Sequence, residues 1–185
     1  MANLKKNNDE IISTSKLILL LVVIVIVGLA IMLSIGDKTY KSSHGFFQIT
    51  VPAGYNFKEN KNAHDDYIFA KVDKKRWLYI FGLAFDNSKV DTFRDVAEDS
   101  YKKQALNVEN INNVSELVPF SHDEYNAYVY TYTYTDAQGH DYYAERYYIN
   151  CSNGYYMLLL ESLLEDKEFV LRDFETIAKS FKEIG

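Results

Sequence analysis

The longest apolar stretch of this chain begins at Leu17 and ends at Ile35, and it contains neither a charged residue nor a proline. As a helix, with a rise of about 1.5 Å per residue, it would cross a hydrocarbon core of about 30 Å. A helix buried in the core of a small domain keeps a polar stripe on one face, and this stretch has none. The pattern therefore predicts one transmembrane helix over residues 17–35.

Charges on the two sides of this run favour one orientation. The segment before it carries three lysines against two acidic residues, and lysine excess marks the cytoplasmic side of a membrane helix. A cleaved signal peptide is the alternative, but its apolar region is usually about 7–15 residues and ends in a small-x-small site, which AIMLSIGDK matches poorly. We expect a cytoplasmic tail (1–16), a membrane anchor (17–35), a short linker (36–44) and one extracytoplasmic domain (45–185) at the cell membrane.

Alternating apolar positions after the linker predict an antiparallel sheet. The clearest strand is AYVYTYTYT at 127–135, because tyrosine, valine and threonine suit a pleated surface. Tight turns at 136–140 and 152–154 join it to two further strands as a meander, and the polar DKKR segment joins two earlier runs as a hairpin. The predicted strands cover 47–51, 67–72, 77–85, 114–120, 127–135, 141–150 and 155–161, with 106–113 irregular.

Two segments carry the helical period. The first follows Asp91 as its expected N-cap and places Phe93, Ala97 and Tyr101 on one face. The second covers about 165–182, and its apolar stripe consists of Val170, Phe174, Ile177 and Phe181. Strands, helix, strands and helix joined by tight turns predict an α+β domain, in which a central antiparallel β-sheet is flanked by helices.

Four pieces of this pattern resemble a known family. They are the opening FFQITVPAGYNF, the helix DTFRDVAEDSYKK, the three-strand meander and the closing FETIAKSF. Over residues 45–182 the chain resembles the PsbP/Mog-like superfamily, whose plant members are extrinsic photosystem II proteins and which includes many exported bacterial domains. The resemblance implies a sheet sandwiched by helices and action through binding other proteins, with no catalytic residues to carry over.

Charge and cysteine content exclude several classes of function. Beyond residue 35 the chain holds 17 basic and 24 acidic residues, a balance that argues against nucleic acid, whose phosphates require a basic surface. It also argues against contact with anionic lipid headgroups. Cys151 is the only cysteine, so no intrachain disulfide forms, and its position at a strand end favours burial.

The tyrosine-rich strand is the candidate binding surface. Alternation places Tyr128, Tyr130, Tyr132 and Tyr134 on one face, where flat rings with hydroxyls suit a sugar ring or a peptide. The alternative is an aromatic ladder covered by a helix. Because the family resemblance implies helices on both sides of the sheet, we expect the middle pair to be largely buried and the outer pair to be partly exposed.

No catalytic, cofactor or metal site is predicted. The four histidines lie in polar loops without H-x-x-x-H spacing, and the sequence has no G-x-S-x-G motif and no phosphate-binding glycine loop. The sequence therefore indicates a membrane-anchored extracytoplasmic binding or accessory module, not an enzyme, with another envelope protein or a cell-wall component as partner. The alternatives are a cell-wall glycan or peptide binder that uses the tyrosine face, or an envelope enzyme of unrecognised type.

Overall fold

The computed structural model describes residues 18–27, 36–42, 46–59, 66–71, 77–85, 92–105 and 110–184, and the chain divides into two compact units, Met1–Gly36 and Asp37–Gly185. In the first unit, residues 18–27 are helical, and all ten side chains are apolar and about half exposed, from 47% for Val22 to 65% for Leu19. No helix within the described ranges is both long and apolar enough to cross a membrane. The remainder of the predicted anchor, Leu17 and residues 28–35, lies outside those ranges.

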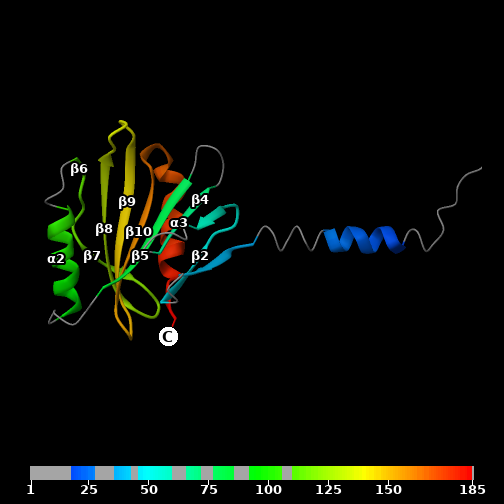
Figure 1. The fold of residues 1–185 in the computed structure, drawn as a ribbon, viewed down its shortest axis with the longest axis horizontal. Coiled ribbons are helices and arrows are strands. Elements are labelled where there is room, and N and C mark those ends of the chain that lie inside the picture. Colours follow the sequence, from blue (N-terminus) through cyan, green and yellow to red (C-terminus); the bar gives the residue numbers. More distant parts are fainter. Residues whose placement is uncertain are drawn as a thin grey trace, which may run out of the picture. The chain divides into compact units, whose positions relative to one another are not determined.

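An eight-stranded antiparallel sheet forms the centre of the second unit (Figure 1). The predicted meander is present as three long neighbouring strands, and the predicted hairpin pairs Tyr67 with Phe81. In spatial order the strands are β3 (Asn56–Glu59), β4 (Asp66–Lys71), β5 (Trp77–Phe85), β10 (Tyr155–Leu163), β9 (Asp141–Asn150), β8 (Asn126–Thr135) and β6 (Ile111–Asn112), and β7 (Val118–Ser121) pairs with the first half of β8.

Helix α2 (Phe93–Ala105) covers one face of this sheet. Its ring contacts reach β8 and β10, since the Phe93 ring lies 5.6 Å from that of Tyr128 and 5.2 Å from that of Tyr155. Further along the helix, the Tyr148 hydroxyl donates to Ser100 Oγ at 2.9 Å. The helix is capped by Thr92, whose Oγ1 accepts from the Asp95 N–H at 3.2 Å, whereas the predicted cap Asp91 lies outside the described ranges.

Helix α3 (Lys167–Lys179), preceded by the 3₁₀ turn η1 (Leu164–Asp166), covers the opposite face. The predicted stripe is buried, with Phe174, Ile177 and Phe181 at 0% exposure. A small sheet of β1 (Lys38–Lys41), β2 (Phe47–Val51) and β11 (Lys182–Glu183) packs beside α3, and the Phe47 and Phe181 rings stack at 5.3 Å. The α+β prediction of a sheet flanked by helices is therefore confirmed.

Local boundaries differ from the prediction where tertiary pairing changes them. Residues expected as linker form β1, because Tyr40 pairs with Ile49 and is buried. The last helix ends at Lys179 instead of continuing to 182, because Lys182 pairs with Gln48. In the segment expected to be irregular, residues 111–112 form β6.

A further difference concerns the strand that precedes the tyrosine-rich strand. It was predicted to begin at 114 but begins at Val118. At Ser115 the side-chain hydroxyl, and not a backbone carbonyl of a paired strand, accepts the Thr131 N–H at 2.9 Å.

Candidate functional site

A cavity of about 320 Å³ lies between the C-terminal end of α2, strand β6 and the tyrosine face of the sheet. Among the described residues that line this cavity, the two charged ones come from the interior of the sheet, and the others are polar or aromatic except for Ile111. The lining residues are Gln104 from α2, Asn110 and Ile111 at β6, Tyr132, Tyr134 and Thr135 from β8, Arg146 from β9 and Glu161 from β10. The volume is at the low end of the range for small-molecule sites, about 300–1,000 Å³.

Strand register explains why the hollow exists at this point. Ala144 lies between Tyr132 on one neighbouring strand and Glu161 on the other, and it is fully buried. Its methyl group fills little of the space between two long side chains, and the next residue on this face of β9 is Arg146. The cavity is thus framed by three large side chains around one small one.

The Arg146 guanidinium lies over the neighbouring rings of Tyr130 and Tyr132 and forms no ion pair with a carboxylate among the described residues. Its carbon is 6.0 Å from the centroid of Tyr130 and 5.9 Å from that of Tyr132. Nη2 donates to the Tyr132 hydroxyl at a long 3.4 Å, and the hydroxyl of Tyr148 is a second neighbour. Within the part of the chain that the structure describes, the buried Nε and Nη1 have no hydrogen-bond partner, and no ion pair includes this arginine.

This arginine stays charged. Burial acts to lower its pKa, but the hydroxyls of Tyr132 and Tyr130 outweigh that effect and the pKa is raised. A buried charge is costly in free energy unless it is paired and hydrogen-bonded. The charge of Arg146 is therefore the least compensated by neighbouring groups among the residues that line this cavity.

Glu161 is the second charged group of the cavity. Burial raises its pKa, while a hydrogen bond from the Tyr134 hydroxyl and the positive charge of Arg146 act in the opposite direction. Because Arg146 pairs with Leu159 and Ala144 with Glu161, the two charged residues are diagonal neighbours on one face of the sheet. Diagonal neighbours are about 7–8 Å apart, which leaves room for a ligand group between them.

The predicted burial of the tyrosine face is confirmed. Tyr130 and Tyr132 are 1% and 5% exposed, whereas Tyr128 and Tyr134 are partly exposed. Two of the four candidates, Tyr132 and Tyr134, line the cavity, Tyr130 lies under Arg146, and Tyr128 packs on Phe93 instead. Binding by this face stays a prediction, now restricted to the end of the strand that α2 leaves partly open.

Arg146, Glu161 and Gln104 were not among the residues singled out from the sequence. The signal for two of them was present, since a charged residue interrupts a run of strand-forming aromatics in AERYY and ends the apolar run YYMLLLE. In a sheet that is covered on both faces, a charged residue within a strand is buried only when another group pairs with it, so such an interruption marks a candidate site residue. Their convergence with Gln104 depends on register and on where α2 packs.

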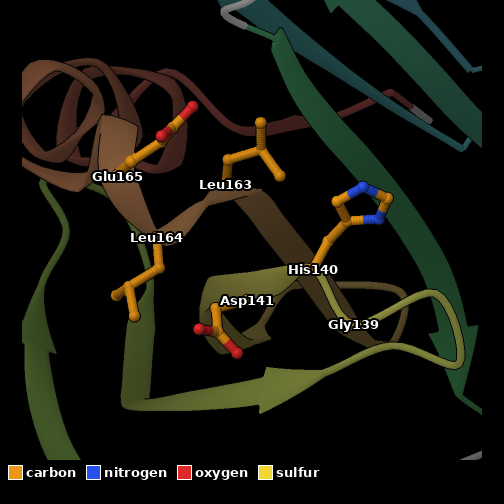
Figure 2. Close-up of a pocket in the computed structure, with 6 residues that line it drawn as sticks. All are labelled: Gly139, His140, Asp141, Leu163, Leu164 and Glu165. Carbon is orange, nitrogen blue, oxygen red and sulfur yellow. The ribbon is translucent and has the colours of Figure 1, made fainter.

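A second hollow, of about 460 Å³, lies where the β8–β9 turn meets the end of β10 (Figure 2). The side chains of His140, Asp141 and Glu165 point in different directions in this view and do not converge. His140 is exposed, and its Nδ1 lies 3.1 Å from Asp136, which also accepts the backbone N–H groups of Gln138 and His140. This larger hollow is the surface of a well-bonded turn.

Glu145 and His122 form hydrogen bonds within the fold. Buried Glu145, on the α3 face, accepts the Tyr143 hydroxyl at 2.6 Å and the Tyr147 hydroxyl as well, and burial raises its pKa against these bonds. Nδ1 of His122 accepts the Glu124 N–H at 3.1 Å in a turn. Among the described residues no group of three or more His, Cys, Asp or Glu could hold a metal ion. Cys151 is half-buried, and burial raises its pKa to about 12, which favours the protonated thiol over the nucleophilic thiolate.

Comparison with known proteins gives one family and one fold. A family model described as the serine/threonine kinase C-terminal domain, STK_strepto_C, matches residues 39–183. No curated protein sequence matches the chain significantly.

Solved structures of similar fold share little sequence with the chain. Cyanobacterial PsbP (CyanoP) from Synechocystis has a TM-score of 0.53 at 15% identity, with 80% of this chain and 93% of that chain covered. LpqN of Mycobacterium tuberculosis, described as involved in cell envelope biogenesis, has a TM-score of 0.55 at 11% identity, with 80% and 91% covered. Identities this low show the fold alone, and that fold is the PsbP/Mog-like one expected from the sequence.

Proposed function

The chain belongs to the serine/threonine kinase C-terminal domain family, and we propose that it is a membrane-anchored module whose Asp37–Gly185 unit binds a small ligand outside the cell membrane. Residues 18–27 support the anchor, because a helix that exposes apolar side chains on all sides suits lipid and not water. The lysines of the N-terminal tail support the outward orientation. The envelope role stated for LpqN, a protein of the same fold, is consistent with that location.

The observation that carries the binding function is the α2-side cavity, defined above by its eight lining residues. It brings a half-buried arginine with unpaired donors and a half-buried glutamate to one aromatic hollow. A concave aromatic site with a few convergent polar groups is what small-molecule recognition requires. A cell-wall component, one of the two partner classes indicated by the sequence beside another envelope protein, supplies sugars and short peptides of suitable size. The PsbP/Mog-like resemblance, which carries no catalytic residues, supports binding over catalysis.

A matched pair of variants on α2 tests the cavity. Gln104 lines it, whereas the neighbouring Lys103 is exposed and forms an ion pair with Asp99 on the outer side of the helix. Gln104→Trp should fill the opening, and Lys103→Trp is the control of equal bulk. The full chain in detergent micelles is melted with and without a soluble digest of bacterial cell wall.

The digest should raise the melting temperature of the wild type and of Lys103→Trp, because a ligand that binds the native state stabilises it. It should leave that of Gln104→Trp unchanged, because the tryptophan fills the cavity. An equal rise in all three proteins would place the ligand elsewhere. No rise in any of them would remove the support for a cell-wall ligand.

The anchor and its orientation are tested separately. Proteinase K applied to intact protoplasts should digest the Asp37–Gly185 unit while a tag at the N-terminus stays protected and sediments with membranes. A protected domain, or a mature protein that begins after Ser34, contradicts the proposed topology.

A further inference from the structure

The charges of the α2-side cavity define the chemistry of its ligand. Among the described residues, the cavity presents one guanidinium and one carboxylate as diagonal neighbours on the same face of the sheet. Since the two formal charges cancel, the complementary ligand also carries one negative and one positive group and is neutral as a whole. A group with a single sign of charge satisfies one of the two residues and is repelled by the other.

We propose, on the basis of the binding function above, that the ligand is an α-amino acid, free or as the unblocked amino-acid head of a larger molecule. Its carboxylate binds the Arg146 guanidinium and its ammonium group binds Glu161. The two groups of an amino acid are on one carbon, so a single small head bridges two side chains whose backbone positions are about 7–8 Å apart.

The positions of both residues are fixed before a ligand arrives. The Tyr130 and Tyr132 rings hold the guanidinium at 6.0 and 5.9 Å from their centroids, and the Tyr134 hydroxyl donates to the Glu161 carboxylate. That bond uses one acceptor position and leaves others for an ammonium group, because an ionised carboxylate accepts about four hydrogen bonds. Preorganised charges lower the cost of binding a small ligand.

Competing ligand classes fit these residues less well. A phosphate would suit Arg146 but would lie beside the Glu161 carboxylate, where like charges repel. A neutral sugar would stack on Tyr134 but would leave the guanidinium without an anionic partner. The apolar part of the wall, with Ile111 and the edges of Tyr132 and Tyr134, is suited to a short aliphatic side chain.

The test uses four amino acids and their blocked forms on the full chain in detergent micelles. L- and D-alanine and L- and D-leucine are titrated by calorimetry, and for the tightest binder the affinity of its amide, which lacks the carboxylate, and of its N-acetyl derivative, which lacks the ammonium, is measured. Each blocked form should bind at least about tenfold more weakly, the loss typical of a charge-assisted hydrogen bond.

Two variants assign the groups. In Arg146→Gln the amino acid and its amide should bind equally, and in Glu161→Gln the amino acid and its N-acetyl derivative should bind equally. Arg94→Gln, on the exposed side of α2, is the control and should keep wild-type affinities. Melting curves of all three variants establish that they are folded, and Glu161→Gln preserves the shape of the native side chain.

Three results would overturn the assignment. The first is binding of the blocked forms as tight as that of the free amino acid. The second is tighter binding of inorganic phosphate that is lost in Arg146→Gln, which would make this a simple anion site. The third is no binding of the four amino acids while the cell-wall digest still stabilises the wild type but not Gln104→Trp. In that third case the cavity remains the binding site, and only its assigned ligand class is wrong.

Discussion

Replacement of Arg146 by methionine is expected to stabilise the domain, although it removes a half-buried side chain from the sheet. Methionine fills the space of the aliphatic stem and remains in contact with Tyr130 and Tyr132. What it removes is a charge with two buried nitrogens, Nε and Nη1, that lack hydrogen-bond partners. If Arg146 serves recognition, its replacement should cost ligand affinity and not stability.

The magnitude follows from the contacts of the guanidinium. Two unpaired buried donors cost about 1–3 kcal/mol each. Against this, two ring contacts at 6.0 and 5.9 Å contribute about 0.5–1 kcal/mol each. The long 3.4 Å bond to the Tyr132 hydroxyl adds about 0.5 kcal/mol, at the low end for a hydrogen bond. The mid-values of these contributions differ by about 2 kcal/mol, so Arg146→Met should raise the free energy of unfolding by about 2 kcal/mol. Each kcal/mol corresponds to about 2–4 °C in a domain of this size.

The assay is the melting temperature of the full chain in detergent micelles, without ligand, followed by titration with the tightest-binding amino acid. Arg94→Met is the matched control, because Arg94 is 71% exposed on α2 in an i,i+4 pair with Glu98, and such surface pairs are worth less than about 1 kcal/mol. Loss of more than about 1 kcal/mol in Arg146→Met would refute the reasoning, since it would mean that the ring contacts outweigh the unpaired donors. Gain of stability with unchanged ligand affinity would refute the binding role instead.

Three further outcomes are expected. Phe181→Ala should lower the free energy of unfolding in urea by about 3–5 kcal/mol, because its ring is fully buried against Phe47. Phe169 is 64% exposed on α3, so Phe169→Ala should cost less than about 0.5 kcal/mol. Similar losses in both variants would mean that the α3 stripe is not part of the core. Burial raises the pKa of Glu145 and of Glu161 above 4.5, so the folded state binds more protons than the unfolded chain just above that pH, and the stability contribution of both groups falls as the pH rises through that window. The difference in melting temperature between the wild type and a Glu145→Gln/Glu161→Gln double variant should thus change between pH 5 and pH 7, and a constant difference would show that neither pKa is raised. Cys151→Ser, measured with and without EDTA, should shift the melting temperature by only a few degrees, because the thiol is half-buried at the sheet margin; a large effect of EDTA would reveal a metal site.

Much of the fold could be predicted from the chain because its signals are local. The meander of β8, β9 and β10 follows from alternation and short polar turns, and the α3 stripe follows from the helical period at Val170, Phe174 and Ile177. Boundaries moved where strand pairing decides them. Strand β1 forms because the nearby strand β2 pairs with it and Tyr40 is buried, and β11 forms because the other edge of β2, which is distant in sequence, pairs with it.

For the candidate site as well, local sequence patterns predicted one part and side-chain packing decided the other. Alternation places Tyr128, Tyr130, Tyr132 and Tyr134 on one face. The family resemblance, which implies helices on both sides of the sheet, led us to expect burial of the middle pair, and the structure confirms it. It could not show that Tyr128 packs under Phe93 while Tyr134 opens onto a cavity. That depends on how far α2 extends along β8, which side-chain packing decides.

By itself, the sequence determined the α+β class, the order of the main strands and helices, the apolar segment before the domain and the face on which the tyrosines lie. Those features depend on hydrophobic periods and turn residues, which act within a few positions of the chain. Only the tertiary structure decided that Arg146 and Glu161 are diagonal neighbours beside Ala144 and line one cavity with the end of α2. Their proximity depends on the register of three strands and on a helix from another part of the chain, and a buried charge acquires its chemistry from those neighbours.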